Sequence, residues 1–149
     1  MATTMGFQPY DTGGVITRYL PAGTNATFHK GDAVTVTTGL VVICTDDQSV
    51  FGVAAADHAA TGVALQMTPV YLADPSVIWV GEVDGTSIVT DVGTSYGLNL
   101  TSQQMSIDQD DTTTTSVRVI DIHPVDGYKA LGRVLFCWRT KAIQGDGAA

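Results

Sequence analysis

The residue types that most often carry out chemistry are sparse in this chain and lie far apart. The three histidines are His29, His58 and His123, and none has a second histidine or a cysteine at the spacing typical of a zinc site. The sequence also contains no Walker loop, no His-Glu-x-x-His and no Cys-x-x-Cys motif. We therefore expect no metal, no cofactor and no enzymatic activity.

The densest group of carboxylates could in principle attract a hard cation. Asp108, Asp110 and Asp111 lie within four positions, and calcium prefers such oxygen ligands. The group lacks the glycine and the distal glutamate of an EF-hand loop. A solvated acidic loop is therefore the favoured interpretation, with a calcium site as the alternative.

A catalytic arrangement of serine, histidine and aspartate could still assemble in space. Such triads are recognised by geometry and not by position in the sequence. Many serines and threonines here occur in strand-like or turn-like contexts, and threonine favours strands because of its β-branch. A small β-barrel hydrolase or protease is therefore one of the functions that the sequence leaves open.

The charge of the chain limits its partners. Seven Lys and Arg against fifteen Asp and Glu give a formal net charge of −8 over 149 residues. Binding to nucleic acid and to anionic membranes requires clustered cations. We therefore expect neither nucleic acid nor a membrane as a partner.

The two cysteines, Cys44 and Cys137, each lie in an apolar run and are far apart in the sequence. We interpret them as buried, reduced thiols, with a disulfide as the alternative. The first residues have neither the basic nor the apolar region of a secretory signal, and no apolar run is long enough for a membrane helix. The expectation is a protein made in a reducing cytosol.

Large aromatic residues occur in two different contexts. Aliphatic residues flank Trp79 and Trp138, which favours burial in the core over an exposed ligand platform. Met5, Phe7 and Tyr10 instead lie in a polar segment without alternation. They either cover one end of the protein itself or anchor on a partner, so we name these three as candidate partner-binding residues.

Strand patterns dominate the elements that would position these residues. Ala33 to Thr37 alternates apolar and polar residues, and Thr38-Gly39 separates it from Leu40 to Cys44, which predicts a hairpin. Further strands are predicted at Val50–Ala55, Thr68–Ala73, Val77–Val83, Val117–Ile122 and Gly132–Arg139. The runs 77–80 and 134–138 are apolar on both faces and are predicted to be central strands. The fold class is therefore all-β, a compact antiparallel β-barrel or β-sandwich.

The chain divides into three predicted parts. Residues 1–13 form an extended N-terminal arm, residues 14–143 the β-barrel domain, and residues 144–149 a flexible tail. Within the domain, residues 101–116 are polar and of low complexity, which predicts a long loop. A short helical turn is predicted around Ala55 to Ala60.

Several short runs resemble those of one protein family. The runs are Pro21-Ala22-Gly23, Lys30-Gly31-Asp32-Ala33-Val34, Val50-Phe51-Gly52-Val53-Ala54, Asp91 to Leu98 and Val117-Arg118-Val119-Ile120-Asp121. Over residues 15–138 the chain resembles the small head decoration, or cement, proteins of tailed bacteriophages.

The resemblance implies a β-tulip-like body on the outer surface of the virion head. There it would bridge neighbouring major capsid proteins and stabilise the shell, as a homo-oligomer, with a trimer favoured and a dimer possible. Residues 1–13 would fit the arm with which such proteins touch the shell. The alternative function is a carbohydrate-binding β-module of a phage tail or spike, with exposed tryptophan, tyrosine and acidic residues as the platform.

Overall fold

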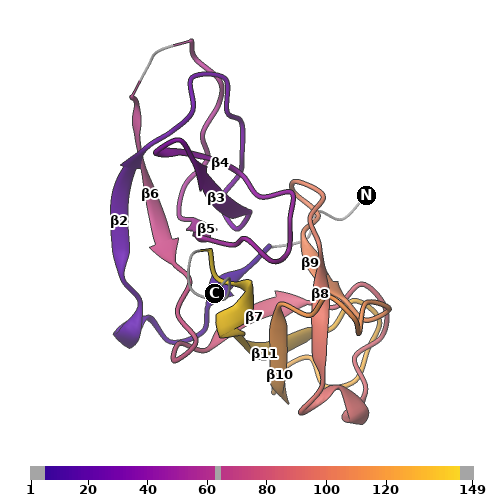
Figure 1. The fold of residues 1–149 in the computed structure, drawn as a ribbon. Helices are drawn as coiled ribbons and strands as arrows, with labels where there is room; N and C mark the ends of the chain where they lie inside the picture. Colours follow the sequence, from indigo (N-terminus) through magenta and orange to yellow (C-terminus); the bar gives the residue numbers. More distant parts are fainter. Residues whose placement is uncertain (1–5, 63–64, 145–149) are drawn as a thin grey trace.

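Two antiparallel sheets form the body of the protein (Figure 1). A computed structural model describes residues 6–62 and 65–144. The strands are β1 Gln8–Pro9, β2 Thr17–Pro21, β3 Ala33–Thr37, β4 Leu40–Ile43, β5 Gly52–Ala54, β6 Met67–Leu72, β7 Trp79–Glu82, β8 Ser95–Asn99, β9 Ser106–Asp108, β10 Val117–Ile122 and β11 Arg133–Trp138. Three short 3₁₀ turns accompany them, η1 at Thr12–Gly14, η2 at Val89–Asp91 and η3 at Thr140–Ala142. The predicted all-β class is confirmed, as a sandwich of open sheets and not as a closed barrel.

The first sheet has the order β1-β7-β11-β10-β8-β9, and the second has the order β2-β6-β5-β3-β4. Both runs predicted to be central lie inside the first sheet, since β7 pairs with β1 and β11, and β11 pairs with β7 and β10. β7 and β11 are therefore interior strands as predicted, but the predicted cover on both faces is wrong in part, since Ile78 is exposed and Cys137 is half-buried.

The main core lies between the two sheets. Its largest side chains are Phe7, Trp79, Phe136 and Trp138 from the first sheet and its N-terminal extension, and Ala33 and Val53 of the second sheet face them. Trp79 and Trp138 are 0% and 1% exposed, with their ring centroids 6.0 Å apart. The predicted burial of both tryptophans is confirmed.

A second, smaller core covers the opposite face of the second sheet. It contains Ala22, Phe28, Val34, Val41, Ala54 and Val70. Phe28 stacks on His58 with ring centroids 5.2 Å apart, and the backbones at these two positions pair by an isolated bridge. The second sheet is therefore covered on both faces, by the first sheet and by the segments around 28 and 58.

The hairpin predicted at residues 33–44 is confirmed. β3 has the predicted bounds, and Val36 faces Val41 across the turn. Thr38 and Gly39 have φ values of +51° and +83°. Two successive positive φ values are typical of a type I′ turn, whose twist matches that of the flanking strands.

Four strands were not predicted from the pattern of the sequence. β1 is two residues long, β2 begins with three exposed residues, β8 contains Gly97, and β9 lies inside the segment predicted to be a loop. The prediction for residues 101–116 was wrong in part, because Met105 and Ile107 are fully buried in the main core. Two apolar side chains in a polar stretch give no detectable periodicity.

Three further predictions are corrected. The segment 55–60 forms bends and the bridge at His58 and has no helical turn. Within the predicted arm, Phe7 lies in the main core and Gln8–Pro9 form β1 of the first sheet, so this part of the arm is not separate from the body. Gln144 also belongs to the body, because its side chain binds the Thr35 hydroxyl and both backbone groups of Val36. Residues 145–149 of the predicted tail lie outside the described residues.

Candidate functional site

The structure separates the three residues predicted to bind a partner. Met5 lies outside the described residues. Phe7 is 1% exposed, so its ring has no surface to offer, and for this residue the prediction of partner binding was wrong. Tyr10 is 47% exposed, with its ring edge-on to His123 at 5.9 Å, so partner contact stays a prediction for Tyr10 alone.

Local backbone geometry fixes Phe7 in the core. The Phe7 N–H donates to the Gly31 carbonyl at 2.8 Å, directly after Gly6 with a φ of +68°. A Cβ on Gly6 would lie 2.6 Å from the same carbonyl oxygen, so only glycine permits this approach. In the sequence, a glycine directly before Phe7 indicates a close backbone contact. The sequence does not show which other segment of the chain makes that contact.

A serine, a histidine and an aspartate do meet in space. Asp32 is 1% exposed and accepts hydrogen bonds from the Ser102 hydroxyl at 2.7 Å, the His29 N–H at 3.0 Å and the Gln103 N–H at 3.1 Å. The His29 ring lies beside this group, with Nδ1 at 3.4 Å from Ser102 Oγ. Sequence reasoning named His29 but missed Asp32 and Ser102, which are 70 positions apart.

The order of these groups differs from that of a hydrolytic triad. In a triad, one ring nitrogen of histidine faces the serine and the other faces the aspartate. Here Nδ1 of His29 faces both Ser102 and Asp32, and the serine donates directly to the carboxylate. The group therefore joins the segment after β8 to the turn before β3, and Met105, three residues after Ser102, is buried in the core.

The run Gly93-Thr94-Ser95-Tyr96-Gly97 has the spacing Gly-x-Ser-x-Gly, a motif that sequence reasoning wrongly took to be absent. A nucleophile elbow needs the serine on a sharp turn from a strand into a helix. Ser95 is instead the first residue of β8, paired with Arg118 of β10. The local structure is therefore not that of an elbow.

Carboxylates gather in an open acidic pocket of about 460 Å³. Its lining residues are Thr45, Asp46, Asp47, Asp84, Leu98, Asn99, Leu100 and Asp108. Burial raises the pKa of Asp47, and the neighbouring carboxylates of Asp111 and Asp46 raise it further. Burial likewise raises the pKa of Asp84, with added repulsion from Asp108. The pocket is a concentrated region of negative charge.

The structure does not gather these acids into a metal centre. Within residues 6–62 and 65–144, no group of three or more His, Cys, Asp or Glu side chains is arranged to hold a metal ion. Asp111 Oδ1 accepts the N–H groups of Thr113 and Thr114, and Asp108 Oδ1 accepts that of Asp110. Asp108 and Asp111 of the predicted acidic cluster therefore each bind backbone N–H groups of their own local turn.

Exposed apolar side chains gather on two loops that lie side by side. We call residues 85–92 and 123–132 the loop pair. The isolated bridge between Thr86 and Ala130 joins its two segments. Its exposed large apolar residues are Ile88, Val89, Val92, Val125, Tyr128 and Leu131, with Val125 80% and Val89 64% exposed.

Buried polar groups hold the loop pair in place. Ser87 is fully buried and accepts the Lys129 N–H at 3.0 Å while donating to the Gly127 carbonyl at 2.8 Å. Asp91 is also fully buried, and its carboxylate accepts from Tyr96 Oη at 2.7 Å and from the Ile88 N–H at 2.8 Å. The exposed apolar side chains therefore stand on a fixed backbone.

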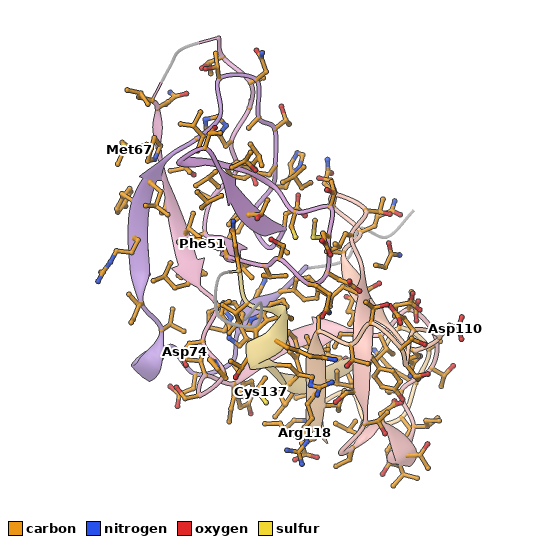
Figure 2. All side chains as sticks on the ribbon, viewed as in Figure 1. Phe51, Met67, Asp74, Asp110, Arg118 and Cys137 are labelled. Carbon is orange, nitrogen blue, oxygen red and sulfur yellow. The ribbon has the colours of Figure 1, made fainter. Side chains whose placement is uncertain are left out.

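A second exposed apolar region lies along β2 and around the start of β6. Tyr19, Leu65 and Met67 are 66%, 66% and 55% exposed. Figure 1 shows β2 at the edge of the second sheet with β6 beside it, and Figure 2 labels Met67 at the start of β6. The two apolar regions come from different sheets.

No model of a known protein family matches the sequence, and no curated protein matches it. Across the part of the chain that the structure describes, no helix has the length and apolar character needed to span a membrane.

Proposed function

We propose that this chain is a structural protein that binds the outer surface of a bacteriophage capsid, bridges neighbouring major capsid proteins and stabilises the head. The proposal rests on the resemblance of residues 15–138 to head decoration proteins. The observation in the molecule that carries it is the loop pair, which offers exposed apolar side chains on a rigid two-sheet body.

Apolar exposure of this kind favours a protein partner. Single exposed apolar residues are normal, but a group of them on one surface region is typical of interaction sites. The Lys129 side chain is the charge nearest to Tyr128 in the sequence, and its ammonium lies 3.9 Å from Asp126. Charged residues are depleted at the centres of protein interfaces. We therefore expect Lys129, which is paired with Asp126, to lie at the edge of the contact with the partner and not at its centre.

Rigidity supports the same proposal. A preformed surface loses little conformational entropy on binding, so more of the contact energy appears as affinity. A protein that binds only the assembled shell stabilises that shell by mass action. Neither effect requires an active site or a cofactor.

Exposed tryptophans would have favoured the carbohydrate-binding alternative, and the structure exposes neither of them. Both tryptophans are buried, so a sugar platform would depend on exposed tyrosines, of which Tyr10, Tyr19 and Tyr128 lie on separate segments. We therefore keep glycan binding only as a contrary outcome of the experiment below.

The test is co-sedimentation of the purified protein with cognate phage heads that lack it. Saturable binding at a fixed ratio to the major capsid protein is expected. The double substitution Val125→Ser and Tyr128→Ser should weaken binding at least about tenfold, which corresponds to about 1.4 kcal/mol. The matched control is Tyr19→Ser with Met67→Ser, which removes similar exposed apolar area from the other region.

Each outcome has a defined meaning. No saturable binding by the unsubstituted protein, together with binding on a glycan array, would contradict the proposed function. Loss of binding in the control pair alone would keep the function and move the contact to β2 and β6.

A further inference from the structure

Three of the seven basic residues of this acidic protein line one pocket. The pocket has a volume of about 420 Å³, and its lining residues are Pro75, Arg118, Cys137, Trp138, Arg139, Thr140 and Lys141. No aspartate or glutamate belongs to this lining. We call it the basic pocket. Its volume lies within the range of small-molecule sites, about 300–1,000 Å³, so it has room for a small ligand.

The pairing of β10 with β11 brings the two arginines of the basic pocket together. Arg118 pairs with Cys137, and Figure 2 shows both on the lower side of the molecule. The adjacent pair, Val117 and Trp138, is buried in the main core, so the first pair projects outward. Arg139 is extended, with φ −81° and ψ 137°, which puts its side chain on the same outer side as that of Cys137. Diagonal neighbours across antiparallel strands are about 7–8 Å apart, a distance that long side chains span.

Contacts within the protein fix the backbone that carries these cations. The Arg139 guanidinium donates to the hydroxyl of Thr115, which is buried. Directly after Lys141, Ala142 is fully buried, and its carbonyl accepts the Val50 N–H at 2.9 Å. The backbone of the basic pocket is therefore in place before a ligand binds, which lowers the entropy cost of binding.

The three cations of the basic pocket form no ion pair in the part of the chain that the structure describes. The ion pairs found there are those of Asp126 and Asp32, with other partners. Asp74 is the carboxylate next to the lining in the sequence, and it accepts the N–H and the hydroxyl of Ser76 at 2.9 and 2.7 Å. The positive charge of the basic pocket is therefore not used within the molecule.

We infer that the basic pocket binds a small, multiply charged oxyanion of the phosphate type. A planar carboxylate is already satisfied by one guanidinium, which binds it through two parallel hydrogen bonds. Two guanidinium groups and one ammonium, carried by β10, the end of β11 and η3, instead match an anion whose oxygens point in several directions, as those of a phosphate group do. A long polyanion is disfavoured, because the net charge of −8 on the whole chain repels it beyond the pocket.

The experiment is isothermal titration of the purified full-length protein with sodium pyrophosphate, without divalent cations and without phage heads. We expect a single equivalent to bind, with a dissociation constant that rises at least tenfold between about 50 and about 500 mM NaCl, since the screening length then falls from about 14 to about 4 Å. The inference goes beyond the proposed function, and because no heads are present its failure is separate from failure of that function.

Cys137 reports where the anion binds, because its half-buried thiol belongs to the same lining. Saturating pyrophosphate should slow the alkylation of Cys137 by the neutral reagent iodoacetamide at least about fivefold, by covering the thiol and by disfavouring its thiolate. Cys44, which is buried outside the basic pocket, should stay unreacted with and without pyrophosphate. Pyrophosphate binding that leaves the alkylation of Cys137 unchanged would place the anion elsewhere and overturn the inference.

Two pairs of substitutions separate the basic pocket from net charge. Arg118→Gln with Lys141→Gln should raise the dissociation constant for pyrophosphate at least tenfold, and the melting temperature without pyrophosphate should not change because both positions are exposed. Arg18→Gln with Lys30→Gln removes two exposed cations outside the basic pocket, and it should leave the dissociation constant within about twofold of the original. Equal weakening by the two pairs would indicate a response to net charge alone and would overturn the inference.

Tricarballylate, a small tricarboxylate, distinguishes the two classes of anion. It should bind at least about fivefold more weakly than pyrophosphate, because planar carboxylates leave part of the cation set unmatched. If it bound as tightly as pyrophosphate or more tightly, the assignment to a phosphate-type ligand would be wrong. Absence of pyrophosphate binding at about 5 mM, where even a weak site of millimolar affinity would be filled, would overturn the inference altogether.

Discussion

The ring of Phe7 meets Trp138 edge to face, with centroids 5.6 Å apart. A residue from the first ten positions is therefore packed against the last strand of the protein. The Phe7 ring also meets Phe136 at 5.8 Å, again nearly perpendicular. Edge-to-face aromatic pairs contribute stability beyond that of their buried area, so the N-terminal segment is part of what holds the sandwich together.

Phe7→Ala should lower the free energy of unfolding by about 3–5 kcal/mol, the usual cost of removing a buried aromatic ring. Chemical denaturation followed by tryptophan fluorescence measures this, since both tryptophans lie in the same core. Tyr10→Ala is the control, with a change below about 1 kcal/mol because Tyr10 is half-exposed. Equal effects of the two substitutions would contradict the assigned burial.

Gly52→Ala should also be destabilising, by at least about 1–3 kcal/mol, as expected for a group forced into a packed site. A Cβ at Gly52 would lie 2.2 Å from the Tyr71 carbonyl oxygen, and this backbone atom belongs to the neighbouring strand β6. Gly14→Ala provides the comparison, because its Cβ would meet only Val77 Cγ2, at 3.6 Å. A thermal melt that leaves both variants unchanged would disprove this close approach.

Lowering the pH should lower the free energy of unfolding, in part because the Asp126 carboxylate becomes protonated. Its carboxylate binds the Arg133 guanidinium through contacts of 2.9 and 2.8 Å, which hold the pKa of Asp126 well below its usual range. A lowered folded-state pKa gives stability that is present above the unfolded pKa of about 3.9 and is lost as the pH falls below it. Asp126→Asn should therefore cost about 1–3 kcal/mol at pH 7 and progressively less below about pH 4.

The matched control for acid sensitivity is Asp110→Asn, which removes an exposed carboxylate. Urea denaturation at a series of pH values measures both variants. If the difference between Asp126→Asn and the original protein stayed constant from pH 7 down to pH 2, Asp126 would not be the group responsible.

Asp111→Asn should change the titration of Asp47. Burial is the first cause of the raised pKa of Asp47, and the Asp111 carboxylate adds repulsion. A raised folded-state pKa means that ionised Asp47 is destabilising at neutral pH, a cost that disappears as the pH falls through that pKa. With asparagine at 111, NMR titration should show a lower pKa for Asp47. The free energy of unfolding at pH 7 should rise by about 0.5 kcal/mol. An unchanged titration of Asp47 would refute this coupling.

The two thiols should differ in reactivity. Burial raises the pKa of Cys44 to about 11, and its thiol donates to the Asp46 carbonyl at 3.0 Å. At pH 8 only about one molecule in a thousand would then carry the reactive thiolate at Cys44. A disulfide reagent should modify one equivalent, at the half-buried Cys137, and Cys137→Ser should abolish this fast phase. Fast modification of Cys44 in the folded protein would contradict its burial.

The local pattern of the sequence determined the elements whose side chains alternate or are apolar throughout. β3 and β10 have the predicted bounds, and the turn at Thr38-Gly39 follows from residues adjacent in the chain. The burial of both tryptophans also follows, because apolar neighbours in a strand bury a large side chain wherever that strand packs. Both cysteines are free, but the predicted burial is confirmed only for Cys44 and was wrong for Cys137, which is half-buried. None of these conclusions needs a knowledge of distant contacts.

Only the tertiary structure decided the position of Phe7, the strand β9 and the meeting of Asp32 with Ser102. Each depends on a contact between segments far apart in the sequence: Phe7 with Trp138, Ile107 with Val83, and Ser102 with Asp32. Polar segments such as 101–116 have no periodicity of their own, so their structure is set by the buried groups of other segments. The same reason places Arg118 and Lys141 in the lining of one pocket, because the face that an exposed cation occupies depends on how the strands pair.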